Sequence, residues 1–373
     1  MYSNSPREED VKRIGIIGTG QIAQNHLKQW AKIDEIEVAV ACDVDENALG
    51  ATRETFGIAQ GYTDFRELLA RDDLDAVDVC LHNNYHAPVA IEALRSGKHV
   101  YCEKPIAGSY ADGKAMLEVA AETGKMLHIQ LSRLYEGPTT ACRMVIDAGE
   151  LGHIYHARAT EYRRRGRPYV DGYGTARFVQ KEHSGGGALY DMGIYELSRM
   201  LYLLGNPSVE RITGRIYQEM EMDAARAGEF DVEEFATGMV SFEDNLTMDI
   251  VSAWAIHLDA FSPSYIAGSK GGLRVDPFSL HKTVADIDFD MTANVGSVMG
   301  RRGLMDPEAS RDMSSSQHHW AAALHDRIQL LPTAQLALNT MLIQQGIYLA
   351  SERGQEVTAE EIMAASTTTA VTL

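Results

Sequence analysis

The chain has 373 residues, of which 45% are hydrophobic and 23% are charged, so it is expected to fold as a globular protein with room for two domains. Its formal net charge of −19 argues against general binding to nucleic acid or to an acidic membrane, because that binding depends on basic side chains that neutralise phosphates. A small anionic ligand is not excluded, since a local cluster of arginines can override the charge of the whole chain.

The cysteines and the N-terminal segment indicate the compartment. Four cysteines lack the spacing of a disulfide framework or of a zinc site: Cys42, Cys80, Cys102 and Cys142. Residues 1–10 are polar and contain no apolar core typical of a signal peptide, and no stretch of about 18 apolar residues occurs in the chain. We therefore expect a reduced, cytoplasmic protein without a membrane or nucleic-acid partner.

A glycine-rich motif follows the first expected strand. The strand covers residues 13–17, and the pattern G-x-G-x-x-A comes next, before a helix expected to reach residue 33. In such a turn Gly18 permits a tight bend, Gly20 lets the backbone approach a pyrophosphate, and Ala23 allows the helix to pack closely on the strand. The alternative is a glycine-rich turn without a ligand. We predict that four residues of the motif bind a dinucleotide: Gly18, Gly20, Gln21 and Ile22.

Asp43 ends the second expected strand, which covers residues 38–42. It lies 20 residues after Ala23, about where an acidic residue binds the ribose 2′-hydroxyl of a dinucleotide. Because a carboxylate there repels a 2′-phosphate, the sequence predicts NAD rather than NADP. The alternative is that Asp43 or Asp45 only caps the next helix.

The alternation of strands and helices continues to about residue 131 and predicts a doubly wound parallel sheet. The expected strands cover residues 76–81, 98–102 and 126–131, and the expected helices cover 65–69, 87–96 and 111–123. Polar side chains that follow such strands face the crevice where open α/β sheets bind ligands. Glu103-Lys104-Pro105 follows one of these strands. His82 and His86 share no metal-ligand spacing with a third residue, so no metal site is expected.

The second half of the chain has a different pattern. Strands expected over residues 154–162, 209–218, 234–242 and 246–255 predict a mostly antiparallel open sheet with one covered face. Residues 219–233 are acidic and are interpreted as a solvated hairpin excursion, and residues 283–313 as a long loop or arm. Helices are expected over 134–148, 316–328 and 333–353, with a capping box at Thr358. The fold class is therefore α/β, with domains at 11–133 and 134–373.

Three glycines, residues 185–187, precede a helical pattern that carries Asp191 and Tyr195. Four residues separate the two, so they are expected on one face of the helix. The glycines would let the backbone pass close to something bulky, such as a cofactor ring. We predict that Lys104 meets Asp191 and Tyr195 across a bound nicotinamide.

These motifs, in this order, resemble the glucose–fructose oxidoreductase/inositol dehydrogenase family (Gfo/Idh/MocA) from about residue 11 to residue 357. The resemblance implies an N-terminal Rossmann domain, a C-terminal open sheet, a tightly held nicotinamide cofactor and sugar or polyol substrates. It also implies a cis Pro105 and a homo-oligomer, a dimer or tetramer, joined through the sheet faces. Further cofactor-binding residues are expected from it and from the crevice: Leu81, Asn83, His86, Glu103, Lys104 and Arg177.

Tyr195 departs from the common pattern, because most family members have His there and this chain resembles the glucose–fructose oxidoreductase branch. Hydride transfer from a carbinol carbon needs a base for the hydroxyl proton, and a free Tyr with a pKa of about 10 is a poor base at neutral pH. A nearby Lys104 cation would stabilise the phenolate. Asp191 would orient the substrate hydroxyl or Lys104. Two alternatives stay open: Lys104 is itself the base, or Tyr195 is a core aromatic and Asp191 a helix-start carboxylate.

Substrate-binding residues are predicted from the arginine run over residues 163–167 and from the end of the last strand. On a strand only alternate side chains face a site, so either Arg163 with Arg165, or Arg164 alone, would bind an anionic substituent. Ion pairing at a sheet edge or subunit contact is the alternative. The predicted set is Arg164, His183, Trp254 and His257, with Arg177 and, less strongly, Tyr173 on the neighbouring loop; Trp254 is equally compatible with a core position.

Three functions are consistent with these residues. The first is an NAD-dependent oxidoreductase acting on a secondary hydroxyl of a sugar, glycoside or polyol. The second is a redox-neutral, NAD-dependent glycosidase that oxidises, eliminates, hydrates and re-reduces, acting on an anionic or sulfonated glycoside. The third is a non-catalytic NAD(H)-binding regulator.

Overall fold

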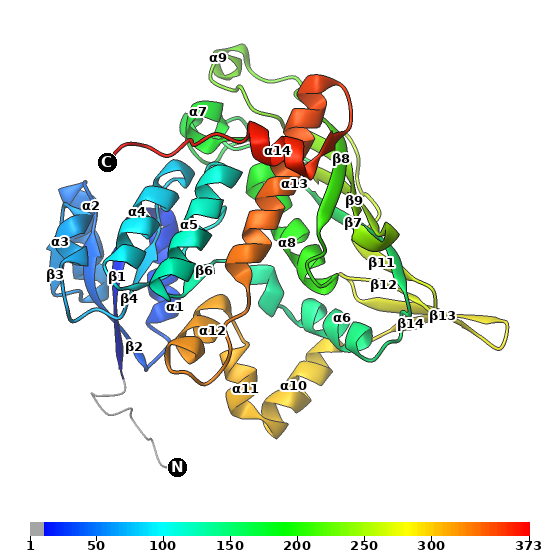
Figure 1. Cartoon of the computed structure of the whole chain (residues 1–373), viewed down its shortest axis with the longest axis horizontal. Helices are drawn as coiled ribbons and strands as arrows, with labels where there is room; N and C mark the ends of the chain where they lie inside the picture. The colour runs from blue at the N-terminus through cyan, green and yellow to red at the C-terminus, as the bar shows by residue number, and fades with distance from the viewer. Residues whose placement is uncertain (1–10) are drawn as a thin grey trace.

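Two sheets, separated by helices, form the molecule, and the computed structural model describes residues 11–373 (Figure 1). The expectation about a signal peptide concerns residues 1–10 and lies outside the described residues. The colour gradient in Figure 1 shows that the first sheet is built from the N-terminal third of the chain and the second from the middle. No helix in the described part combines the length and apolar character needed to cross a membrane.

The first sheet has six parallel strands in the order β3-β2-β1-β4-β5-β6. Its strands are β1 (Lys12–Ile17), β2 (Ile36–Cys42), β3 (Gln60–Tyr62), β4 (Ala76–Val79), β5 (His99–Cys102) and β6 (Leu127–Ile129). Helices between the strands cover both faces, which is why β4 is buried along its whole length. They are α1 (Gln21–Trp30), α2 (Glu46–Phe56), α3 (Phe65–Leu69), α4 (Asn83–Arg95) and α5 (Tyr110–Thr123).

The second sheet has nine strands in the order β14-β13-β12-β11-β7-β10-β9-β8-β15. All neighbours are antiparallel except β7 and β10. The predicted strands are β7 (Ile154–Tyr162), β8 (Val209–Tyr217), β9 (Phe235–Phe242) and β10 (Thr247–Ala253); the others are β11 (Tyr265–Gly268), β12 (Gly272–Arg274), β13 (Ser279–Val284), β14 (Ile287–Thr292) and β15 (Val357–Thr358).

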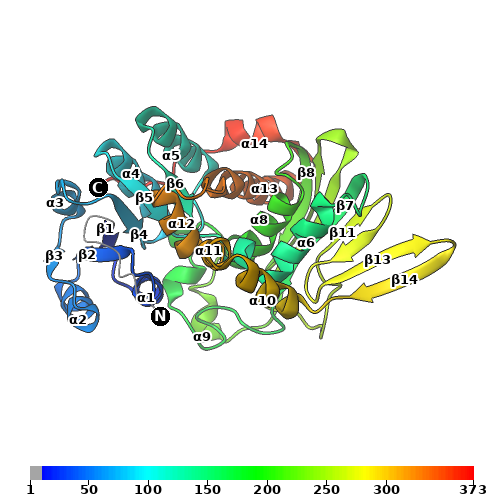
Figure 2. The same cartoon turned by 90° about the horizontal axis from the view of Figure 1, so that it is seen from below.

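Helices cover one face of the second sheet, as predicted. In Figure 2 α8 (Ile194–Leu203) and α13 (Thr333–Arg353) lie between the two sheets, and α6 (Gly137–Asp147) lies on the same side of the second sheet. Ala157 and Ala159 of β7 are buried on this covered face, whereas Arg158 between them points the other way and pairs with Asp249 of β10. The alternation along β7 therefore decides which side chains can reach the space between the sheets.

Two segments differ from the prediction. Residues 283–313 are not one loop: they complete the β13–β14 hairpin and then form α10 (Val295–Met305) and α11 (Pro307–Asp312). Residues 219–233 contain a short helix, α9 (Ala224–Ala227), and end in buried side chains, among them Phe230 and Glu233. That excursion is thus only partly solvated, because its apolar residues pack against Trp254.

A helix from the C-terminal part of the chain packs against the first sheet. α12 (Ser316–Leu324) places Trp320 against Tyr101 of β5, with ring centroids 6.0 Å apart. α14 (Ala359–Ala365) begins with the predicted capping box, in which Thr358 and Glu361 satisfy each other's backbone amides. The fold class is confirmed; the division at residues 133 and 134 stays a prediction.

Candidate active site

The glycine-rich turn lies at the carboxyl ends of β1 and β4. Gly18 has a φ of 91°, and a Cβ there would lie 2.3 Å from the carbonyl oxygen of Cys80, so only glycine fits. The position that a Cβ would take at Gly20 has no atom within 4 Å, so the backbone faces open space. α1 begins without a side-chain cap or an acidic residue in its first turn, and its exposed Gln21 and Ile22 border that space. An uncapped helix start beside open space fits a pyrophosphate.

Asp43 faces the glycine-rich turn. One of its carboxylate oxygens accepts hydrogen bonds from the backbone N–H and the hydroxyl of Thr19, at 2.7 and 2.8 Å. The cap of α2 is instead Asp45, whose side chain accepts from Asn47 and Ala48. Of the two residues that the alternative interpretation named as caps, Asp45 has that role, whereas the Asp43 carboxylate faces the glycine-rich turn.

Lys104 and Asp191 come from different halves of the chain and form an ion pair. The Lys104 ammonium donates to a carboxylate oxygen and to the backbone carbonyl oxygen of Asp191, both at 3.1 Å. Burial alone would lower the pKa of Lys104, but the charges of Asp191, Tyr195 and Glu103 raise it above its ordinary value. Burial would raise the pKa of Asp191, whereas the Lys104 charge and hydrogen bonds from Lys104 and Trp254 lower it. Both groups are therefore ionised near neutral pH.

Tyr195 completes the predicted trio through its ring. The Lys104 ammonium lies 4.7 Å from the ring centroid, and the Arg133 guanidinium lies 5.8 Å from it. Cations at this distance from an aromatic face are stabilised by the ring's negative face. The structure thus brings Lys104, Asp191 and Tyr195 together, and adds a second cation that the sequence did not single out.

A widened helical turn carries Asp191. Residues Leu189–Gly193 form a π-helical turn before α8, instead of the regular helix that was predicted. The buried carboxylate of Glu233 accepts hydrogen bonds from the backbone N–H groups of Gly187 and Leu189, each at 2.8 Å. Such turns occur often at functional sites, because the extra residue re-aims the side chains around it.

Atoms of the protein itself approach two of the glycines before this turn closely. A Cβ at Gly187 would lie 1.9 Å from the Glu233 carbonyl oxygen, and one at Gly186 would lie 2.3 Å from the Tyr348 hydroxyl. These two glycines are therefore explained by packing within the protein, against side chains at Gly186 and against backbone at Gly187, and the expectation that they make room for a cofactor ring is not needed.

Trp254 lies behind the ion pair and not in open space. Its side chain is 1% exposed, and its indole N–H donates to the second carboxylate oxygen of Asp191 at 3.0 Å. The ring therefore orients Asp191 and offers no exposed platform for a sugar. The core position, which the sequence left open, is the one observed.

Other predicted cofactor residues divide into partly buried and fully buried groups. Leu81 borders Gly18, and the Asn83 amide donates to the carbonyl oxygen of Ser184 at 2.8 Å, which joins α4 to the loop before Gly185. His86 is fully buried, with ring nitrogens 2.7 and 3.0 Å from the carbonyl oxygens of Pro105 and Leu81. The Lys104–Pro105 peptide is cis. His86 supports this turn from behind, and Glu103 is buried behind it as well.

The loop before the glycines closes over the start of α4. Arg177 and His183 are exposed, and both contribute charge near His82. Burial and these neighbouring charges lower the pKa of His82. The three side chains therefore lie near one another, at the crevice end of the first sheet.

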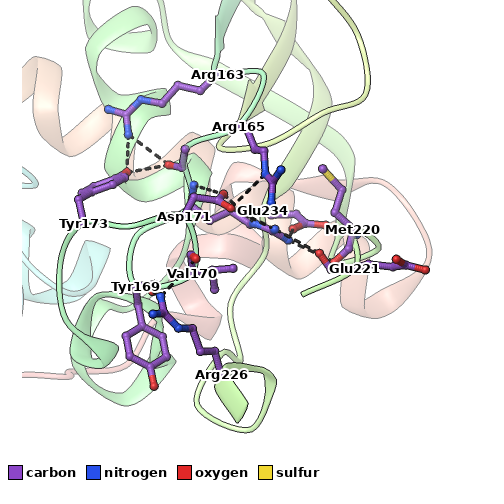
Figure 3. Close-up of polar contacts among 12 residues, drawn as sticks. Arg163, Arg165, Tyr169, Val170, Asp171, Tyr173, Met220, Glu221, Arg226 and Glu234 are labelled. Atoms are coloured by element: carbon purple, nitrogen blue, oxygen red, sulfur yellow. Dashed lines mark hydrogen bonds and ion pairs between the residues drawn. The ribbon is translucent and has the colours of Figure 1, made fainter. Parts of the chain in front are cut away.

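The arginine run is split between three environments (Figure 3). Arg163 continues the covered face of β7, donates to the Tyr173 hydroxyl and to the carbonyl oxygen of Gly166, and its charge helps lower the pKa of Asp191. Arg165 pairs with Asp171 at 3.4 Å, and Arg167 is buried in ion pairs with Asp171 and Glu234. Ion pairing, the alternative interpretation, therefore accounts for two of these arginines.

Arg164 and His257 lie elsewhere. They line a groove of about 650 Å³ together with Arg165, Arg167, Met220, Glu221 and Ile256. None of Lys104, Asp191 and Tyr195 lines this groove. The strand alternation turns Arg163, and not Arg164, toward Asp191, so the structure does not bring the predicted Arg164 and His257 to the ion pair.

Sequence reasoning missed the support around Tyr195. Arg133 pairs with Glu161 at 2.6 Å and with Glu196 at 2.7 Å, and burial raises the pKa of Glu161. Arg133 follows β6, so the rule that polar residues after parallel strands face the crevice would have found it. Glu161 has the same strand parity as the buried Ala159.

Comparisons with known proteins agree with this arrangement. Residues 12–131 match the oxidoreductase family with an NAD-binding Rossmann fold, and residues 139–274 match the GFO/IDH/MocA C-terminal domain. D-glucoside 3-dehydrogenase of Escherichia coli K12 is 27% identical over 92% of this chain and 97% of its own length. Inositol 2-dehydrogenase of Salmonella paratyphi B is 30% identical over 52% of this chain and 54% of its own.

A solved structure of levoglucosan dehydrogenase in complex with NADH has the same fold, with a TM-score of 0.78, 20% identity, and coverage of 93% of this chain and 99% of that one. The two family matches together span most of the chain, and the first of them coincides with the six-stranded sheet and its glycine-rich turn. The chain therefore belongs to the Gfo/Idh/MocA family of oxidoreductases, with NAD as the cofactor of its Rossmann domain.

Proposed function

We propose that the protein transfers hydride from a secondary hydroxyl of a sugar, glycoside or polyol to NAD. One observation carries the proposal: Lys104, held as an ammonium by Asp191, lies against Tyr195 at the crevice end of the NAD-binding sheet. The names of the relatives, D-glucoside 3-dehydrogenase and inositol 2-dehydrogenase, support this substrate class.

The proton and the hydride take separate routes in this proposal. NAD supplies the hydride acceptor. The substrate hydroxyl gives its proton to the phenolic oxygen of Tyr195, while Lys104 and Arg133 stabilise the negative charge there. Since the raised pKa of Lys104 keeps it protonated, it acts as the electrostatic partner and not as the base. Asp191 fixes the Lys104 ammonium and is itself held by Trp254.

Cofactor binding is assigned to the residues that border the open space at the crevice. Asp43 would bind the ribose hydroxyls, and the turn at Gly18 and Gly20 with the start of α1 would bind the pyrophosphate. The remaining contacts are proposed from Gln21, Ile22, Leu81, Asn83, Lys104 and Arg177. His86 and Glu103 would support the Lys104 turn without touching the cofactor.

A second candidate function is a redox-neutral glycosidase that uses the same residues. Arg163 favours an anionic glycoside, because within residues 11–373 it pairs with no carboxylate and its charge reaches Asp191. Oxidation of a sugar hydroxyl to a ketone acidifies the adjacent C–H. Loss of that proton expels the aglycone, water then adds to the double bond, and the same NADH returns its hydride to the ketone.

The deciding experiment incubates the protein with NAD and a panel of neutral and anionic aryl glycosides, and follows NADH at 340 nm together with aglycone. Net NADH without aglycone supports the dehydrogenase. Aglycone that requires NAD but yields no net NADH supports the glycosidase. NAD(H) binding with neither signal contradicts both proposals and favours a regulator.

Assembly and location are proposed on other grounds. Exposed apolar side chains on the uncovered face of the second sheet, Tyr217 and Met239, support a dimer or tetramer joined through that face. Four buried cysteines without disulfides support a reducing, cytoplasmic location. Light scattering coupled to gel filtration tests the first point, and fractionation of the source cells tests the second.

A further inference from the structure

A buried imidazole bridges two carboxyl groups behind the Lys104 turn. His26 on α1 is 2% exposed. Its Nδ1 lies 2.9 Å from Oδ2 of Asp78 on β4, and its Nε2 lies 2.8 Å from Oε1 of Glu103. Trp30 donates its indole N–H to the same Asp78 oxygen at 2.7 Å. His26 is therefore the only link between Asp78 and Glu103 among the hydrogen bonds of the described residues.

Both contacts require His26 to donate. A neutral imidazole carries one N–H, and an ionised carboxylate only accepts, so two such contacts need the imidazolium. Burial alone would lower the pKa of His26, but the charge of Asp78 raises it well above the ordinary value. Burial would likewise raise the pKa of Glu103, but the hydrogen bond and charge of His26 lower it. His26 is thus a cation that donates to both carboxyl groups.

Cys80 belongs to the same cluster, whose donor atoms resemble a metal-binding set. Its sulfur lies 3.3 Å from Nδ1 of His26 and 3.4 Å from a carboxylate oxygen of Asp78, which are hydrogen-bond distances. Burial raises the pKa of the Cys80 thiol, so it stays protonated and donates to Asp78. Hydrogen bonding accounts for the whole cluster, and no metal is needed.

Glu103 connects His26 to the ion pair between Lys104 and Asp191. Its second oxygen, Oε2, accepts a hydrogen bond from the backbone N–H of Lys104 at 2.8 Å. The same residue reaches Asp191 with its ammonium. A continuous chain of contacts therefore runs from α1, which begins at the cofactor turn, through His26 and Glu103 to the backbone of Lys104.

We propose that His26 is a positioning residue, which fixes the Lys104 turn to the cofactor-binding helix α1 through the carboxylate of Glu103. The inference rests on the proposed function for the catalytic role of Lys104. Without the N–H at Nε2, the buried Oε1 of Glu103 loses its partner and the turn loosens. Since a misplacement of about 1 Å can reduce turnover about 100-fold, we expect kcat to fall at least about 10-fold while NADH affinity changes less than about threefold.

Two substitutions of His26 distinguish a role in positioning the Lys104 turn from a general role in protein stability. His26→Gln keeps an amide N–H near the place of Nε2, facing Glu103. His26→Asn keeps one near the place of Nδ1, facing Asp78, and leaves Glu103 without a donor. Both variants remove the same charge from the same buried place. Only a positioning role through Glu103 predicts that they differ at Lys104.

Amide hydrogen exchange on the full-length protein, read by mass spectrometry on peptides that contain Lys104, makes the comparison without needing turnover. We expect the Lys104 amide to exchange at least about 10-fold faster in His26→Asn and within about threefold of the unchanged protein in His26→Gln. Asp78→Asn, which leaves the bond between His26 and Glu103 in place, should also keep Lys104 protected. NADH titration by fluorescence confirms that the cofactor site is intact.

Equal exchange in the two His26 variants overturns the proposal, as does a protected Lys104 amide in His26→Asn. Faster exchange of the Lys104 amide in Asp78→Asn also overturns the proposal. This variant decides the question if the His26 variants do not fold. His128→Gln is the matched control, because it removes another buried imidazole of the same sheet, whose ring nitrogens contact Ser316 and Thr333. It should leave the Lys104 amide unchanged. Because exchange is independent of substrate, failure of the dehydrogenase proposal does not affect this test.

Discussion

Asp191 holds the ammonium of Lys104 twice, once through its carboxylate and once through its backbone carbonyl, each at 3.1 Å. This carbonyl belongs to the π-helical turn at Leu189–Gly193, where the regular hydrogen-bond pattern of a helix is widened. Lys104 is therefore fixed both by charge and by backbone, which makes it the residue whose removal is most informative.

Replacing Lys104 with Met keeps most of the length of the side chain and removes the ammonium and its charge. We expect turnover to fall at least about 1,000-fold, because the cation that stabilises the reacting oxygen is lost. NAD should still bind, since the glycine-rich turn and Asp43 are untouched. Steady-state kinetics and calorimetric titration with NAD test this prediction. A variant that keeps more than about a tenth of the activity of the unchanged protein would contradict a catalytic role of Lys104.

Asp43→Ala should weaken the preference for NAD over NADP, because the carboxylate that repels a 2′-phosphate is lost. We expect the ratio of the two dissociation constants to move at least about 10-fold toward NADP, measured by titration with each cofactor. Asp45→Ala is the control: it removes the cap of α2, should cost about 1 kcal/mol of stability, and should leave the ratio unchanged. An unchanged ratio in Asp43→Ala contradicts the ribose assignment.

Trp254→Phe removes the indole N–H that donates to Asp191 and keeps most of the packing. That hydrogen bond lowers the pKa of Asp191, so its loss should raise this pKa and shift the acidic limb of the kcat profile to higher pH. Phe230→Leu changes the same apolar cluster without touching Asp191 and should leave the limb in place. The pH dependence of kcat in both variants decides whether Trp254 acts on Asp191.

Arg163→Gln should reduce kcat/KM for anionic glycosides at least about 10-fold more than for neutral ones. The reason is that Arg163 turns its charge toward Asp191 without a carboxylate partner in residues 11–373. Arg165→Gln removes the same charge nearby, but the Arg165 side chain is 74% exposed and pairs with Asp171, so the selectivity between anionic and neutral glycosides should not change. Equal losses for both substrate classes would show that Arg163 supports the loop and not the substrate.

Glu233 gives a prediction about stability. Burial raises its pKa, so its contribution to stability is present at low pH and is lost as pH rises through its folded pKa. Glu233→Gln loses an acceptor for the amides of Gly187 and Leu189, which should cost roughly 1–3 kcal/mol. The melting temperature of the variant should also fall less between pH 5 and pH 8 than that of the unchanged protein; Glu229→Gln, on the exposed part of the segment, should behave like the unchanged protein.

The sequence predicted which residues would meet more reliably than how they would face one another. Lys104 and the glycine-rich turn follow parallel strands whose ends gather at one edge, so their proximity comes from the alternation of elements alone. The orientation of the Tyr195 ring and the burial of Trp254 depend on packing between the halves of the chain. The short, weakly periodic strands β11–β14 gave too little pattern to be predicted.

The arginine run illustrates the same limit. Strand alternation correctly divided Arg163 from Arg164, but which of the two faces the site depends on the register of β7 against its neighbours. A shift of the register by one residue would turn Arg164 instead of Arg163 toward the site, and this register cannot be predicted from the sequence. For His26, the signal was present but ambiguous, since a buried His on a helix next to a glycine-rich turn is compatible with ordinary packing.

α12 forms part of the core of the N-terminal region, although it lies far away in the sequence. Its Trp320 and Leu324 share a core with Ile14, Trp30 and Tyr101, and Ser316 accepts the hydroxyl hydrogen bond of Tyr101 at 2.9 Å. A fragment that ends at residue 133 would expose these aromatic rings to water and lose the bond of Tyr101. The core of the NAD-binding region is therefore completed by residues that lie almost two hundred positions later in the chain.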